Sequence, residues 1–211
     1  FIHVSGGNTI KRGSSMPAPG TSPAPHAHSS EEIKKHVNIP VATVARINEP
    51  WIAEELIANE KCDMCMIGRP NLCDSEFANK AFEGKVDDIR PCIGCGRCLT
   101  GIMMGKRISC TVNPSVEDDT IAPAETKKKV LVIGGGPAGM EAAYVAKKRG
   151  HEVVLCEKSN ELGGQLRLAA VPIAKQELCK VIKFMIRRLD HEGIEVRLNT
   201  EVTKEMLENE F

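Results

Sequence analysis

The stretch that decides the fold of this chain is Val130-Leu131-Val132-Ile133-Gly134-Gly135-Gly136-Pro137-Ala138-Gly139. The four apolar residues predict a strand, and the Gly134-x-Gly136-x-x-Gly139 spacing predicts a tight turn into a helix. In such a turn the first glycine makes the bend, the second lets a pyrophosphate approach, and the third lets the helix pack on the strand. The helix N-terminus adds N–H groups and a positive dipole end. The stretch therefore predicts the start of a Rossmann-like dinucleotide-binding domain.

A carboxylate follows where the ribose of a dinucleotide would bind. We expect a second strand over residues 152–156, and Glu157 ends it, 18 residues past Gly139. A carboxylate at this point accepts a hydrogen bond from a ribose hydroxyl and repels a 2′-phosphate. FAD or NAD therefore fits better than NADP. With a further helix around 174–191 and a strand over 194–198, we assign residues 127–211 to the first part of an FAD-binding domain.

Four of the nine cysteines form a cluster before this domain, with the pattern Cys92-x2-Cys95-x2-Cys98-x11-Cys110. An iron–sulfur cube takes four thiolates, three from a tight loop and a fourth from a more distant residue. Zinc is the alternative, but zinc usually takes two separated C-x-x-C pairs. The spacing therefore favours a [4Fe–4S] cluster, in a segment with its linker over residues 91–126.

Cys62 and Cys65 also have C-x-x-C spacing, but we do not expect chemistry there. Cys65 lies in the apolar run 64–67, which we predict to be a buried strand, and free cysteines mostly behave as small buried hydrophobes. The N-terminus lacks the charged and apolar regions of a secretory signal. Nine cysteines without such a signal favour a reducing compartment, so we expect a cytoplasmic protein.

Residues 1–90 alternate short strands with helices. We expect strands over 1–4, 40–45 and 63–67, the second of them buried on both faces. The helices cover the ranges 29–36, 50–59 and 75–83, and Ile52, Leu56 and Ile57 share one face of the second helix. The spacing Ser29-x-x-Glu32 predicts a capping box for the first helix. The alternation predicts parallel βαβ units. Three strands cannot close an eight-stranded barrel, but they can be its last three, so we expect the C-terminal part of a (β/α)8 TIM barrel.

The predicted ends of these strands carry Ser5-Gly6-Gly7, Arg46 and Gly68-Arg69. TIM barrels often bind a phosphate after strands seven and eight. A glycine lets backbone N–H groups approach the phosphate, and arginine grips it with a planar fork. Arg46, Gly68 and Arg69 are therefore candidate phosphate ligands. The alternative, that both arginines are ordinary surface residues, stays open at this point.

The charge balance excludes some classes of partner. Lys and Arg number 28, Asp and Glu also number 28, and there is one Trp. This composition gives no electrostatic reason to expect nucleic acid or an anionic membrane. No apolar stretch approaches the ~18 residues that a membrane helix needs. The chain has no initiator Met and opens inside a predicted strand, so we expect a fragment of a longer protein.

In this order the motifs resemble the NADH:flavin oxidoreductases related to old yellow enzyme. The resemblance is to the multidomain branch with 2,4-dienoyl-CoA reductase, 2-enoate reductase and trimethylamine dehydrogenase, and it covers nearly the whole chain. The motifs that carry it are Ala45-Arg46-Ile47, Ile67-Gly68-Arg69-Pro70, Asp88-Ile89-Arg90-Pro91-Cys92-Ile93-Gly94-Cys95, Cys110-x-Val112-Asn113-Pro114, Gly134-Gly135-Gly136-Pro137-Ala138-Gly139 and Leu162-Gly163-Gly164-Gln165.

The resemblance implies three redox stations. NAD(P)H reduces FAD, electrons pass through a [4Fe–4S] cluster, and FMN in the barrel reduces a C=C bond conjugated to a carbonyl. It implies FMN-phosphate contacts at Arg46, Gly68 and Arg69, and cluster ligation by the four clustered cysteines. The residues implied to contact FAD, besides the glycine loop with Pro137, are Ala138, Glu157, Gly164, Gln165 and Val202.

Two features depart from the family pattern. Many relatives have C-x3-C before the third cysteine, where this chain has C-x2-C. Relatives such as the dienoyl-CoA reductases carry a His after the strand that matches 1–4, where this chain has Asn8 and Thr9. We expect the loop 8–28 to shape the substrate pocket, with His26 and His28 more often exposed to solvent than in contact with substrate. The catalytic residues stay unassigned, and we expect the family's tyrosine donor before residue 1.

Three functions remain in competition. The leading hypothesis is an ene-type reductase that acts on a small unsaturated carbonyl compound. The second is an amine dehydrogenase, which shares FMN and the cluster but oxidises its substrate. The third is a non-catalytic electron-transfer module, which would not need βα strands ending in Gly-Arg. A homo-oligomer is compatible with all three.

Overall fold

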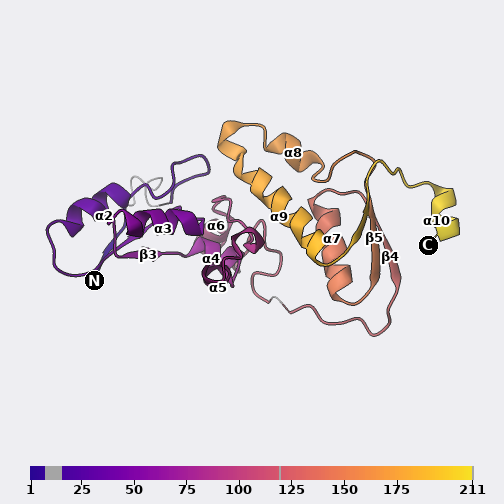
Figure 1. Ribbon diagram of the computed structural model, residues 1–211, viewed down its shortest axis with the longest axis horizontal. Coiled ribbons are helices and arrows are strands. Elements are labelled where there is room, and N and C mark those ends of the chain that lie inside the picture. Colours follow the sequence, from indigo (N-terminus) through magenta and orange to yellow (C-terminus); the bar gives the residue numbers. More distant parts are fainter. Residues whose placement is uncertain (8–15, 119, 211) are drawn as a thin grey trace. The chain divides into compact units, whose positions relative to one another are not determined.

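A computed structural model describes residues 1–7, 16–118 and 120–210. The chain divides into two compact units, Phe1–Glu117 and Asp118–Phe211, and each is described by itself (Figure 1). Residues 91–117 of the predicted cysteine segment fall within the first unit. The boundaries at 90 and 126 stay predictions.

The first unit is built on a parallel three-stranded sheet. Its strands are β1 (Ile2–Val4), β2 (Val41–Val44) and β3 (Met64–Met66), in the order β1-β2-β3. Val4 pairs with Thr43, and Thr43 pairs with Cys65. Val41, Ala42 and Thr43 have no exposed surface. The three predicted strands and the burial of the middle one are confirmed.

Short helices connect and follow these strands. They are α2 (Ala27–Lys34), α3 (Pro50–Ala58), α4 (Arg69–Cys73), α5 (Phe77–Phe82) and α6 (Arg97–Met103), with a 3-10 turn over Val86–Asp88. The helices α2 and α3 pack against the sheet. The apolar face of α3 buries Ile52 and Leu56 against Ile47 and Cys62. This packing fixes the direction in which the chain leaves β2 and enters β3, and therefore the position of both strand ends.

Four details of the sequence prediction for this unit are wrong. The helix α2 begins at Ala27, and Glu32 pairs with Lys35 and His36, so there is no capping box. Ile57 is exposed because it lies one residue beyond the buried face of α3. The strand β3 lies at the edge of the sheet, with Met64 and Met66 exposed. The single helix predicted over 75–83 is shorter, and α4 precedes it.

The second unit is built on another parallel sheet. Its strands are β4 (Lys129–Ile133), β5 (Glu152–Cys156) and β6 (Glu195–Arg197), in the order β4-β5-β6. The helices are α7 (Pro137–Lys148), α8 (Gln165–Ala169), α9 (Glu177–His191) and α10 (Lys204–Glu210), with a 3-10 turn over Ile173–Lys175. The strands and the helices α7 and α9 were predicted, whereas α8 and α10 were not. The helix α6 of the first unit was not predicted either.

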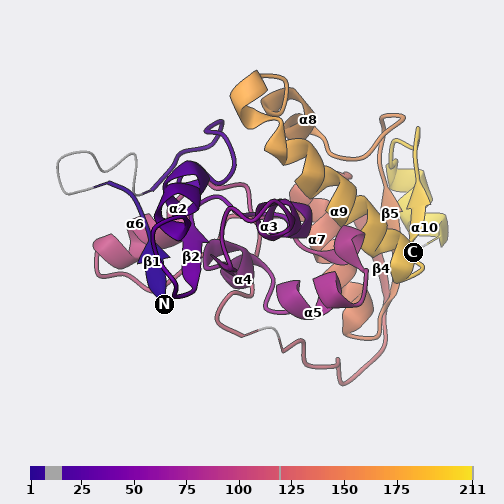
Figure 2. The same ribbon diagram turned by 60° about the vertical axis from the view of Figure 1, so that its left-hand side comes forward.

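The helix α7 packs on β4 and β5, and α9 packs on α7 (Figure 2). Met140, Leu155 and Leu189 form the centre of this core, each with at most 1% of its surface exposed. Arg188 joins the two helices, because it pairs with Glu141 and lies 3.7 Å from the centroid of the Tyr144 ring. The glycine loop thus stands on a fully packed βαβ unit.

The two parallel sheets confirm the α/β class of the fold. Within the described residues, no helix is long and apolar enough to cross a membrane.

Candidate functional site

The glycine-loop site consists of Gly134–Gly139, Glu157 and the loop Leu162–Gln165. Gly134 has a φ of +100°, a conformation that favours glycine. A Cβ atom at Gly139 would lie 1.9 Å from the carbonyl oxygen of Gly134, so only glycine lets α7 approach β4 this closely. The roles predicted for these two glycines in the backbone are therefore confirmed.

Open space surrounds the middle of the loop. A Cβ atom at Gly136 would meet no atom within 4 Å, and Pro137 and Ala138, which begin α7, are exposed. The first N–H groups of a helix lack partners within the helix and attract anions. The loop therefore leaves room for a phosphate at the N-terminus of α7.

Glu157 is already engaged by the backbone of the site. Its Oε2 accepts the N–H of Gly135 at 2.6 Å, and its Oε1 accepts the N–H and the hydroxyl of Ser159 at 2.9 and 2.6 Å. The Ser159 hydroxyl, followed by the backbone N–H groups of Ser159 and Gly135, lowers the pKa of Glu157. The carboxylate is therefore ionised at neutral pH and can accept a ribose hydroxyl.

A second loop closes onto the first. The N–H of Gly163 donates to the carbonyl of Gly135 at 2.8 Å, and a Cβ atom at Gly164 would lie 3.3 Å from the Gly136 Cα. Gln165 is exposed at the start of α8. Val202 lies between β6 and α10, near Thr200, whose N–H donates to the Glu157 carbonyl at 2.9 Å. The structure thus brings the glycine loop, Glu157 and Gly164 together, and Val202 stands at their margin.

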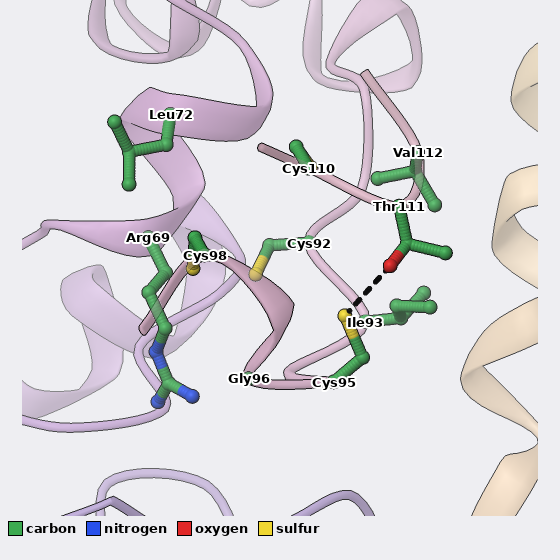
Figure 3. A pocket seen from close by; sticks show the side chains of 10 residues that line it. All are labelled: Arg69, Leu72, Cys92, Ile93, Cys95, Gly96, Cys98, Cys110, Thr111 and Val112. Carbon is green, nitrogen blue, oxygen red and sulfur yellow. Dashed lines mark hydrogen bonds between the residues drawn. The ribbon is translucent and has the colours of Figure 1, made fainter. Parts of the chain in front are cut away.

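The second candidate site is a pocket lined by the four predicted ligands Cys92, Cys95, Cys98 and Cys110, which we call the thiol pocket (Figure 3). Leu72, Ile93 and Val112 give the pocket apolar walls, and Arg69 gives it one charged wall. Cys98 is buried and Cys95 is exposed, with its sulfur 3.2 Å from the Thr111 hydroxyl. All four predicted ligands therefore come from two separate segments to one cavity.

The end of strand β2 holds the first cysteine loop in place. The Asn48 amide donates to the carbonyl of Cys92 at 3.1 Å. Gly94 has a φ of +62°, and a Cβ atom there would lie 2.5 Å from Nη1 of Arg46. The loop therefore needs glycine at this position for two reasons, its backbone conformation and the close approach of Arg46.

The surroundings of two of the thiols shift their pKa values in opposite directions. Burial raises the pKa of Cys92 to about 11, although the N–H of Gly94 and the charge of Arg69 oppose this. A hydrogen bond with Cys73, helped by the N–H groups of Val112 and Asn113, lowers the pKa of Cys110 to about 6. Cys110 thus has the environment of a thiolate, which is the form that binds metals.

The four thiols share the pocket without meeting at one point. Among the described residues, no three His, Cys, Asp or Glu side chains are grouped closely enough to hold a single metal ion. A zinc ion bonds each of its thiolates at about 2.3 Å and so needs the sulfurs tightly gathered. A four-iron cluster binds each thiolate through a different iron and spreads them farther apart. A [4Fe–4S] cluster bound by these four thiolates therefore stays a proposal.

The third site is a pocket at the strand ends of the first sheet, which we call the strand-end pocket. Its walls include Ser5 after β1, Arg46 after β2, and Gly68 and Arg69 after β3. Arg46 is 5% exposed, so the alternative of an ordinary surface arginine is wrong for this residue. The pocket gathers all three candidate phosphate ligands, and Arg69 lines it as well as the thiol pocket.

The loop predicted to shape a substrate pocket is described only in part. Asn8 and Thr9 lie outside the described residues. His28 is exposed, as predicted. His26 is 8% exposed, and a Cβ atom at Gly6 would lie 2.1 Å from its ring, so the prediction of solvent exposure is wrong for His26. The absence of a side chain at Gly6 makes room for the ring.

Sequence reasoning missed several residues that support these sites. Ser159 orients Glu157, Asn48 holds the Cys92 loop, and Cys73 contacts Cys110. Their contacts arise from the packing of separate segments, so the spacing of these residues in the sequence does not predict them. Cys73 in particular belongs to no C-x-x-C pair in the sequence.

Comparisons with known proteins agree with the two-unit organisation. The family of FAD dependent oxidoreductases matches residues 129–208. The chain is 45% identical to the NADH oxidase of Thermoanaerobacter brockii, over 80% of this chain and 27% of that protein. It is 40% identical to the bilirubin reductase of Mediterraneibacter gnavus, over 98% of this chain and 33% of that protein.

A solved structure of 2-naphthoyl-CoA reductase in complex with 2-naphthoyl-CoA superposes with a TM-score of 0.90. Its sequence is 32% identical, and the match covers 97% of this chain and 32% of that one. The chain thus spans about a third or less of the length of these relatives.

Proposed function

Because the chain belongs to the 2,4-dienoyl-CoA reductase and old yellow enzyme family of flavin oxidoreductases, we propose that it forms the centre of the electron path in an ene-type reductase. The proposed path runs from NAD(P)H to FAD, through a [4Fe–4S] cluster, to FMN, which reduces a C=C bond conjugated to a carbonyl. The first unit is then the C-terminal part of a TIM barrel, and the second the start of a Rossmann-like FAD domain.

One observation carries this proposal, namely that Arg69 lines both the thiol pocket and the strand-end pocket. A cluster and a flavin bound in the two pockets would share Arg69 as a wall. An iron–sulfur cluster moves single electrons, whereas nicotinamide delivers a hydride, and a flavin handles both. Adjacent pockets of this kind are what a flavin fed by a cluster requires.

The residues of the strand-end pocket fit the phosphate of FMN. Arg46 is buried beside the pocket, and Arg69 offers a second guanidinium from the first turn of α4. Charge-assisted bonds from arginine to phosphate are short and strong, and the planar fork can bind two oxygens at once. Within the described part of the chain, no atom lies within 4 Å of a Cβ position at Gly68, so a phosphate can approach the backbone there.

The residues of the glycine-loop site fit FAD. Glu157 is ionised and points both oxygens into a set of N–H and O–H donors, and the open space at Gly136 faces the N-terminus of α7. The carboxylate disfavours a 2′-phosphate at this position. Pro137, Ala138, Gln165 and Val202 remain proposed contacts of the same cofactor.

Stopped-flow kinetics under anaerobic conditions tests the proposed reaction. The holoenzyme prereduced with NADH should be reoxidised by an enone, an enoate or an enoyl thioester. Failure with all three, together with flavin bleaching by a secondary or tertiary amine, would favour the amine dehydrogenase instead. Flavin reduction without turnover of either substrate class would favour an electron-transfer module.

The identity of the substrate, a cytoplasmic location and a homo-oligomeric state also remain proposals.

A further inference from the structure

The loop Leu162–Gln165 packs on the glycine loop with a backbone that has little stiffness of its own. Gly163 has a φ of +115° and Gly164 a φ of +50°. A Cβ atom at Gly135 would lie 2.2 Å from Cδ2 of Leu162, so the Leu162 side chain lies directly against the glycine loop. Glycine has more conformational freedom to lose than any other residue. Two adjacent glycines therefore need contacts with other groups to keep one conformation.

Arg167, in the first turn of α8, supplies such contacts. Its Nε donates to the carbonyl of Leu162 at 2.5 Å, and its Nη1 lies 3.1 Å from Oε2 of Glu161. A Cβ atom at Gly163 would lie 3.1 Å from both Cγ and Nε of Arg167, so the arginine side chain lies against the Gly163 backbone. One side chain thus contacts three consecutive residues, from Glu161 to Gly163.

The two contacts of the guanidinium differ in strength. The Glu161 side chain is 54% exposed, and an ion pair at such a site contributes little to stability. The bond to the Leu162 carbonyl has an ionised donor and is partly buried, which makes it the stronger of the two. The loop is therefore held by the glycine loop, which accepts the N–H of Gly163, and by Arg167, which donates to the carbonyl of Leu162.

We propose that Arg167 is a positioning residue that keeps the loop Leu162–Gln165 closed on the glycine loop and thereby sets how tightly FAD is held. This inference rests on the proposed function, because it assumes FAD in the glycine-loop site. Arg167 need not touch the cofactor. Without its bond to Leu162 the loop is closed for a smaller fraction of the time, and the affinity for FAD falls in proportion to that fraction.

The test is a titration of the full-length protein, freed of its flavins, with FAD, followed by the quenching of flavin fluorescence. In Arg167→Ala we expect FAD to bind about tenfold more weakly, the lower end of the effect of one hydrogen bond to a charged group. Amide hydrogen exchange, measured by mass spectrometry on the FAD-free protein, supplies a second readout. The amides of residues 163–165 should exchange faster in this variant, with the rest of the second unit unchanged.

Two further variants separate the Leu162 bond from charge. Glu161→Gln removes the ion pair alone, and Arg149→Ala removes an exposed arginine at the end of α7, so both should bind FAD like the wild type. Equal losses in Arg167→Ala and Glu161→Gln would overturn the role of the Leu162 bond. Unchanged FAD affinity in Arg167→Ala, or faster exchange throughout the second unit, would overturn the role of Arg167. A wild-type protein that binds no FAD would overturn the proposed function as well.

Discussion

The glycine-loop site and the thiol pocket both stand on parallel βα units, but different parts of the chain hold them together. The glycine-loop site is made mainly of backbone: Gly139 packs against Gly134, Gly163 bonds to Gly135, and Glu157 is held by N–H groups. The thiol pocket is made of side chains, and among them the sulfur of Cys95 lies 3.2 Å from the Thr111 hydroxyl. The first site is held by contacts within the backbone, whereas the second depends on the side chains that line it.

Removal of one thiol should therefore have the largest effect. Cys98 is buried in the wall of the thiol pocket, and Cys98→Ala leaves one iron without a ligand. Removal of an outer partner of a metal ligand lowers metal affinity roughly 10- to 100-fold. Removal of a ligand itself should lower the affinity further, so we expect most of the iron to be lost. Iron and acid-labile sulfide measured on anaerobic protein check this. Cys65→Ala, outside the pocket, is the control, and equal iron loss there would contradict the assignment.

Overpacking should break the glycine-loop site without any change of charge. In Gly139→Ala the new methyl group meets the Gly134 carbonyl oxygen at 1.9 Å, so α7 must move away from β4. We expect the second unit to lose about 3 kcal/mol of stability, measured by chemical denaturation. Gly136→Ala has open space at the same loop, so it should fold normally and bind FAD more weakly. Equal destabilisation by both substitutions would disprove the distinction between packing and binding.

The strand-end pocket and the glycine-loop site should also lose different flavins. Arg69→Ala removes a charge-assisted bond to phosphate worth about 1.5–3 kcal/mol, so FMN should bind roughly 10- to 150-fold more weakly. Glu157→Ala should instead lower FAD occupancy, because it removes the acceptor for the ribose and loosens the Gly135 backbone. Flavins released from each variant can be separated by chromatography. Loss of the same flavin from both would show that the sites are assigned wrongly.

The smallest expected effect concerns backbone strain beside the strand-end pocket. Ala45 has a φ of +86°, which side chains rarely adopt, so Ala45→Gly should relieve strain. We expect the first unit to gain roughly 0.5–1 kcal/mol after the entropic cost of glycine is subtracted. Ala42→Gly, in the buried extended strand β2, should change stability in the opposite direction. A loss of stability in both variants, measured by denaturation, would count against strain at Ala45.

The contrast between the glycine-loop site and the thiol pocket also explains which of their residues could be predicted from the sequence. The glycine loop and Glu157 were predictable because their contacts lie within one βαβ unit with fixed spacing. The cysteines that line the thiol pocket were predictable as a group, because Cys92, Cys95 and Cys98 follow one another at fixed intervals; their role as cluster ligands stays a prediction. Its surroundings were not, because Asn48, Cys73 and Arg90 reach it by packing of separate segments.

Errors in the fold prediction have a similar cause. The capping box at Ser29 was wrong because α2 begins at Ala27, so Ser29 lies inside the helix and not at its N-cap. The burial predicted for β3 was wrong because, among the strands of the described residues, β3 pairs with β2 alone, which leaves Met64 and Met66 exposed. His26 became buried because Gly6, distant in sequence, leaves space for its ring.

The metal content of the thiol pocket tests the central claim most directly. Holoenzyme purified without oxygen should contain about four irons and four acid-labile sulfides per chain, and Cys98→Ala should lose both. The account predicts this stoichiometry together with a characteristic reduced-cluster signal in electron paramagnetic resonance. Stoichiometric zinc without acid-labile sulfide would contradict it.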